Sequence, residues 1–100
     1  MTMPRKGSRP VHVDGATYRF MVRDEGHNQE TLRVVVEPEA YPGHVFIATF
    51  GRHLLDPIGI PQAATLVRYA LKVGWAPAAM SNFVLGETDI LDMLGSVVQR

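Results

Sequence analysis

The sequence of 100 residues contains no cysteine, and this absence excludes several kinds of site. Disulfides, cysteine-ligated zinc, iron–sulfur clusters and thiol nucleophiles all need that side chain. The absence also fits a reducing compartment, so we expect a cytoplasmic protein. No apolar run approaches the ~20 residues of a membrane-spanning helix, and the basic start lacks the apolar stretch of a secretory signal. We therefore expect no membrane association.

The chain also lacks net charge, because ten basic residues balance ten acidic ones. A neutral protein has no overall field that attracts nucleic acid or an acidic membrane. Binding to nucleic acid would therefore depend on a local basic patch. The start of the chain is basic and rich in Pro, Gly and Ser, so we expect a disordered basic tail over 1–9. The length then allows a single α+β domain over 10–100.

Catalytic and metal-binding signatures are missing as well. The four histidines are scattered, and no pair has the H-x-H or H-E-x-x-H spacing that places two metal ligands on one face. No serine lies in a G-x-S-x-G turn, and no glycine-rich phosphate loop occurs. We therefore expect no catalytic residue, no metal and no cofactor.

The first half of the chain alternates between apolar and polar residues, as half-buried strands do. Asp14 and Gly15 separate two such runs and suit a type I′ turn, whose central residues both need positive φ. Further runs over 31–38 and 44–50 follow after short loops. Short loops favour strands that pair with their neighbours in sequence, so we expect an antiparallel sheet of four or five strands.

The period then changes to that of an amphipathic helix, which we predict over 61–73. Pro61 suits the first helical position, where its missing N–H costs nothing. Gly74 suits the left-handed residue that ends a helix, and Pro77 prevents the helix from continuing. We expect Trp75, the only tryptophan, to cap the core with its indole N–H satisfied. Gly-Trp-x-Pro is thus interpreted as a structural corner.

The end of the chain predicts one more strand and one more helix. The strand covers 83–85, and the helix covers 88–98 with Thr88 or Asp89 as its cap. The predicted order is β-β-β-β-α-β-α, in which the sheet packs against the 61–73 helix. The apolar face of the last helix is wider than one small sheet needs, so we expect a homodimer through this helix or a sheet edge.

Three stretches of the chain, TYRFMVR, IPQAATLVRYALKVGWAP and FVL, resemble a group of small uncharacterised bacterial proteins. That group has a Tyr-Arg-aromatic strand, a helix opened by Pro and closed by Gly-Trp-x-Pro, and a final Phe-x-Leu strand. The resemblance spans 11–85. It implies the same fold and, because the group has no known function, it implies no catalytic residue.

Three arginines are the first candidate binding residues. By strand alternation, Arg19, Arg23 and Arg33 lie on the sheet face opposite the one that the helix covers. They suit an anion or nucleic-acid surface, whereas a solvated face with balancing acidic neighbours is the simpler interpretation. Met21 and Val35 share this face, and apolar residues beside arginines are typical of protein–protein surfaces.

Three functions remain open at this point. The first is a non-enzymatic protein-interaction module that acts as a homodimer and has an unidentified protein partner. The alternative is a nucleic-acid-binding module that uses the three arginines and the basic tail. The third is a small-molecule-binding protein or enzyme with a pocket between sheet and helices, near Tyr41, His44, His53 and Tyr69.

Overall fold

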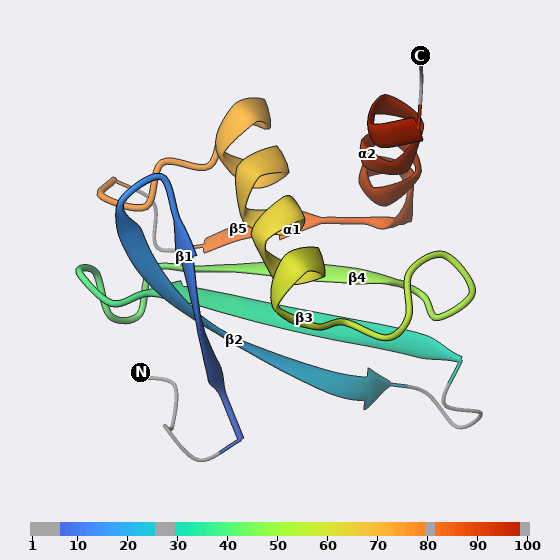
Figure 1. Ribbon diagram of the computed structural model, residues 1–100, viewed down its shortest axis with the longest axis horizontal. Coiled ribbons are helices and arrows are strands. Elements are labelled where there is room, and N and C mark those ends of the chain that lie inside the picture. The colour runs from blue at the N-terminus through green and yellow to red at the C-terminus, as the bar shows by residue number, and fades with distance from the viewer. Residues whose placement is uncertain (1–6, 26–29, 80–81, 99–100) are drawn as a thin grey trace.

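The computed structural model describes residues 7–25, 30–79 and 82–98. A single sheet has the strand order β1-β2-β3-β4-β5, and two helices lie on one side of it (Figure 1). Strands β1 to β4 are antiparallel, and β5 runs parallel to β4 because α1 carries the chain back across the sheet. The predicted α+β class and element order are confirmed. The elements are β1 (Arg9–Val13), β2 (Ala16–Glu25), β3 (Thr31–Pro38), β4 (Val45–Gly51), α1 (Ile60–Val73), β5 (Asn82–Leu85) and α2 (Glu87–Val98).

The turn between β1 and β2 has the predicted conformation. Asp14 has φ 51° and Gly15 has φ 83°, so both central residues occupy the left-handed region that a type I′ turn needs. The register places Val11 opposite Tyr18, and it directs the aromatic ring toward the helix side of the sheet. The Asp-Gly dipeptide thus sets which face of β2 is buried.

Helix α1 begins one residue earlier than predicted and ends where predicted. The Gly59 N–H donates to Oε1 of Gln62 at 2.9 Å, and Pro61 occupies the first turn. At the other end Gly74 has φ 132°, and its N–H donates to the Ala70 carbonyl at 3.2 Å. The backbone N–H of Trp75 donates to the same carbonyl at 2.8 Å, which turns the chain back toward the sheet.

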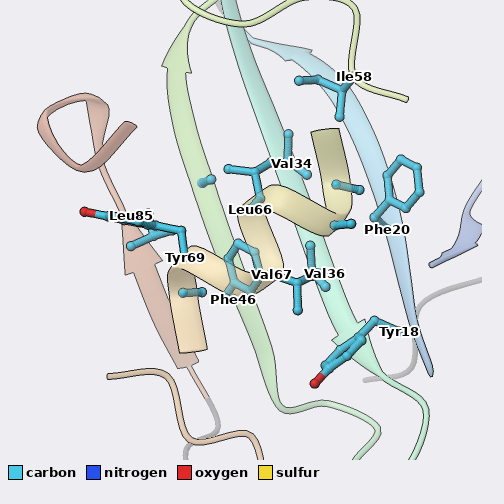
Figure 2. Packing of buried hydrophobic residues seen from close by; sticks show 14 of the residues in the cluster. Tyr18, Phe20, Val34, Val36, Phe46, Ile58, Leu66, Val67, Tyr69 and Leu85 are labelled. Atoms are coloured by element: carbon cyan, nitrogen blue, oxygen red, sulfur yellow. The ribbon is translucent and has the colours of Figure 1, made fainter. Parts of the chain in front are cut away.

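The core fills the space between the sheet and the two helices (Figure 2). Side chains alternate along each strand, so every second residue of β3 and β4 points into this space. Full burial of one such aliphatic side chain stabilises the fold by about 1.5–3 kcal/mol. The largest fully buried residues are Phe46, Phe50, Leu32, Leu66, Leu85, Ile90, Met93, Val11, Val13, Val34, Val36 and Val67.

Helix α2 is capped in a different way from the one predicted. It begins at Glu87, and neither Thr88 nor Asp89 occupies the cap position. Instead, Gly86 precedes the helix, and its N–H donates to Oδ2 of Asp89 at 2.9 Å. A carboxylate in the first turn that accepts from the cap N–H satisfies a donor that the helix itself leaves free.

The predicted N-terminal tail covers 1–9, and residues 1–6 of it lie outside the described part of the chain. Ser8, however, is buried, and Arg9 opens β1. The Arg19 side chain explains this order, because its Nε donates to Oγ of Ser8 and a second guanidinium N–H donates to the Ser8 carbonyl. No helix within the described ranges is long and apolar enough to cross a membrane.

Candidate functional site

The sheet face that lies away from α1 and α2 carries an apolar row across four strands. The register aligns Met21 with Val35, Val35 with Ile47, and Ile47 with Val84. The first three are half-buried by their neighbours, whereas Val84 is 68% exposed. The row therefore ends at β5 in the most exposed large apolar side chain among the described residues.

The three candidate arginines lie on this face as predicted, but they do not form one patch. Arg19 is occupied by Ser8, and its guanidinium lies 3.8 Å from Glu39. Arg23 and Arg33 are register partners on β2 and β3, next to the apolar row. The Arg23 Nε also lies 3.4 Å from the Met21 sulfur. The guanidinium of Arg19 is thus a structural group that anchors the chain before β1.

The two edges of the sheet differ in their chemistry. The β1 edge has Pro10, which lacks an N–H, and Arg9, whose guanidinium lies over the Phe20 ring at 5.4 Å from its centroid. Charge and proline are ordinary means of preventing edge-to-edge pairing. Strand β5 has the sequence NFVL, without charge or proline, and its shortness is its one protecting feature. The free edge of β5 is therefore the exposed pairing template of the sheet.

The four residues of the predicted pocket are not brought together. Tyr41 and His44 stack at one end of β4, with ring centroids 5.9 Å apart. His53 follows the opposite end of β4, where its Nε2 lies 3.8 Å from a Glu87 oxygen. Tyr69 lies on α1 and donates to Oδ2 of Asp92 at 2.8 Å. Within the described ranges, no group of three or more His, Asp or Glu side chains is placed to hold a metal ion.

The Tyr69 hydroxyl has a strongly shifted acidity. Burial raises its pKa, and the hydrogen bond to Asp92 together with the charges of Asp92 and Asp89 raises it further, to about 12. This contact joins the two helices through a phenol that must stay protonated to donate. The arrangement is a structural link between α1 and α2.

The Tyr69 link predicts a specific alkaline instability. The ordinary pKa is 10.0 and the folded value is about 12, so stability from this group is complete below pH 10 and is lost as pH rises toward 12. We expect the free energy of unfolding to fall less steeply over this range in Tyr69→Phe than in the native chain. Urea titrations at a series of pH values measure both slopes, and equal slopes would contradict the assignment.

A pocket of about 460 Å³ lies at the end of the sheet that carries the Asp14-Gly15 turn. Three segments distant in sequence form it: the β1–β2 turn, the β3–β4 turn and the corner after α1. Tyr41 lines it, whereas His44, His53 and Tyr69 do not. The lining residues are Gly15, Ala16, Thr17, Tyr18, Pro38, Glu39, Ala40, Tyr41, Pro77 and Ala78.

Tyr18 and Tyr41 are the aromatic residues of this pocket. Tyr18 is only 5% exposed, and its hydroxyl has no hydrogen-bond partner in the described part of the chain. Burial, and then the charge of Asp14, raise the Tyr18 pKa, so the group is a neutral phenol. Tyr41 is 42% exposed and is held against His44, whose Nδ1 lies 2.6 Å from the Pro77 carbonyl.

Trp75 packs beneath this end of the sheet, as predicted, but its indole N–H is not satisfied as predicted. The ring meets Phe46 edge-on at 4.8 Å between centroids and meets Tyr18 at 5.8 Å. Its Nε1 is buried without a partner among the described residues. Trp75 lies between the rings of Phe46, which has no acceptor, and Tyr18, whose hydroxyl does not accept a hydrogen bond from Nε1.

The pocket was missed from sequence because each of its segments has a sufficient local explanation. Asp-Gly predicts a turn, and so do Pro42-Gly43 and the Ala76-Pro77 corner. Nothing local states that three turns meet at one end of a sheet. The one available signal was that Tyr41 and Trp75 lie within such turns, where large aromatic residues are less typical than small polar ones.

Comparison with known proteins adds no family. No family model matches the chain, and neither a curated protein nor a solved structure matches it. The resemblance to the group with the Gly-Trp-x-Pro corner therefore rests on those sequence motifs alone.

Proposed function

We propose that the protein is a non-enzymatic interaction module that forms a homodimer through the free edge of β5. The observation that carries the proposal is Val84, which is 68% exposed on an edge strand that has neither charge nor proline. An apolar side chain at this position favours pairing with another strand. Pairing would bury the apolar surface and would give hydrogen-bond partners to the backbone groups of the edge.

A twofold axis at this edge would pair β5 with β5 of a second copy in antiparallel fashion. The two five-stranded sheets would become one, and the apolar row that ends at Val84 would continue into the partner. Four paired residues bury too little surface for a stable dimer, which needs about 800 Å² on each partner. Leu91, 53% exposed on α2, supplies apolar surface on the helix side, because only Gly86 separates β5 from α2. The zero net charge adds no repulsion between copies.

The nucleic-acid alternative receives less support. It relied on three arginines and on the basic tail, of which residues 1–6 lie outside the described part of the chain. Of the arginines, Arg19 is occupied by Ser8 and Glu39. Arg23 and Arg33 remain as neighbours beside the apolar row, which suits a protein partner better than a phosphate track. We therefore propose this face as the surface that binds a protein partner other than the second copy.

If the protein dimerises through the β5 edge, two substitutions at that interface should halve its mass in solution. We expect native protein to sediment as two chains at micromolar concentration and Val84→Lys/Leu91→Lys to sediment as one, because four lysines would then meet at the twofold axis. Sedimentation velocity measures the mass, and far-UV circular dichroism checks that the variant is folded.

Ile60→Lys is the matched control, since Ile60 is a large apolar residue, 46% exposed, on α1 and away from β5. This variant should remain a dimer. Native protein that sediments as a monomer at the highest attainable concentration would refute the proposal. A double-lysine variant that is still dimeric would place the interface elsewhere and refute the β5 edge.

A further inference from the structure

The pocket at the turn end of the sheet is independent of the β5 edge and has a chemistry of its own. It is lined by two tyrosines, two prolines and three alanines, and its single charged lining residue is Glu39. Its volume of about 460 Å³ lies in the range of small-molecule sites, roughly 300–1,000 Å³. We propose that this pocket binds an organic cation with an apolar body, namely an alkylamine or a quaternary ammonium compound.

The charges near the pocket favour a positive ligand. Glu39 lines it, and Asp14 is close enough to Tyr18 to raise the pKa of the phenol. No Lys or Arg is among the lining residues. Arg19 approaches Glu39 only to 3.8 Å and donates its hydrogen bonds to Ser8, so the Glu39 carboxylate, about half exposed, retains capacity for a second cation.

The aromatic rings supply the second part of the recognition. A cation within about 6 Å of a tyrosine ring face is attracted by the ring quadrupole, and quaternary ammonium groups are bound this way in aromatic cages. Tyr41 is exposed but already positioned, because it stacks on His44 and the His44 ring is held by the Pro77 carbonyl. A preordered ring loses little conformational entropy when the ligand binds.

The Tyr18 hydroxyl adds a polar group to the recognition. The Tyr18 side chain is mostly buried, at 5% exposure, and it lines the pocket. Its oxygen is not among the buried polar atoms that lack a partner, so it is open to the pocket and available to a ligand. A neutral phenol can accept a hydrogen bond from an ammonium N–H or donate one to a ligand hydroxyl.

The test uses choline and its uncharged isostere, 3,3-dimethylbutan-1-ol, which has the same shape. We expect choline to shift the amide resonances of Ala16, Ala40 and Ala78 in ¹H–¹⁵N spectra of the native chain. The isostere should bind about 2-fold to 30-fold more weakly, the range that a cation–π contact supplies. The alkylamine part of the proposal is tested in the same way, by comparing the binding of n-butylammonium with that of butan-1-ol.

Three variants separate the contributions of charge and ring. Glu39→Gln and Tyr41→Ala should each weaken choline binding several-fold, whereas Tyr41→Phe should keep it because the ring remains. Both side chains are exposed enough to be changed without unfolding the protein. Glu30→Gln removes the same charge at an exposed position outside the pocket and should leave binding unchanged.

Three results would overturn the proposal. The first is the absence of shifts at the three alanines with both cations at millimolar concentration. The second is equal binding of each cation and its neutral isostere, and the third is an equal loss of binding in Glu39→Gln and Glu30→Gln; either would show that the pocket does not recognise charge. Because the β5 edge is not involved, the Val84→Lys/Leu91→Lys variant should bind choline as the native chain does.

Discussion

Replacement of Trp75 by alanine is expected to lower the free energy of unfolding by about 3–5 kcal/mol. The side chain is 2% exposed and contacts the rings of Phe46 and Tyr18, so its removal leaves a cavity that the short corner loop cannot fill. A domain of this size is stable by only about 5–15 kcal/mol in total. The expected loss is therefore a large part of the total free energy of unfolding. The urea concentration at the midpoint of unfolding should fall accordingly.

Trp75→Phe is the informative companion of this variant. It keeps an aromatic ring against Phe46 and removes an indole N–H that has no described partner, so no hydrogen bond is lost. We expect a clearly smaller loss than in Trp75→Ala. Far-UV circular dichroism is the appropriate probe, because both variants lack the only tryptophan. Equal losses would show that the N–H has a partner and that the structural interpretation of Trp75 is incomplete.

Leu66→Ala should be the second large effect, with a loss of about 2–5 kcal/mol in the free energy of unfolding. Leu66 lies in the middle of α1, has no exposed surface and points at the sheet among the buried valines (Figure 2). The spread of the expected loss reflects how far the neighbouring side chains can close the cavity. Urea unfolding of the variant and the native chain, at equal protein concentration, measures the difference.

Ile60→Ala is the control for Leu66→Ala, because it removes the same number of carbon atoms from the same helix. Ile60 is 46% exposed, so the expected change is within about 0.5 kcal/mol. A large loss in Ile60→Ala together with a small loss in Leu66→Ala would mean that α1 packs on the sheet through a different face.

Local rules account for the parts of the fold that were predicted to within one or two residues. The Asp14-Gly15 turn follows from the two positive φ values that the dipeptide tolerates, and the bounds of α1 follow from Pro61 and Gly74. The cap of α2 was wrong for a local reason too. Glycine can occupy a cap position when a carboxylate three residues later accepts a hydrogen bond from the glycine N–H, as Asp89 does from Gly86.

The candidate site was predicted much less well, because it depends on distances between elements. Strand alternation placed Arg19, Arg23 and Arg33 on one face, but it could not indicate that Ser8 folds back onto Arg19. The four residues of the expected pocket proved to lie at different ends of β4 and on α1. His44 precedes β4 and His53 follows it, so the length of the strand, at about 3.3 Å per residue, separates them.

The sequence by itself determined the class of the protein, its element order and the face of each strand that is buried. These properties follow from periodicity and turn chemistry, which act over a few residues. Only the tertiary structure decided that β5 joins β4 as an edge strand, that three turns border a pocket beside Tyr18 and Tyr41, and that the Trp75 indole N–H has no partner among the described residues. Those properties arise when segments far apart in the sequence pack together, where the packing of the whole core selects one arrangement among many that the local rules permit.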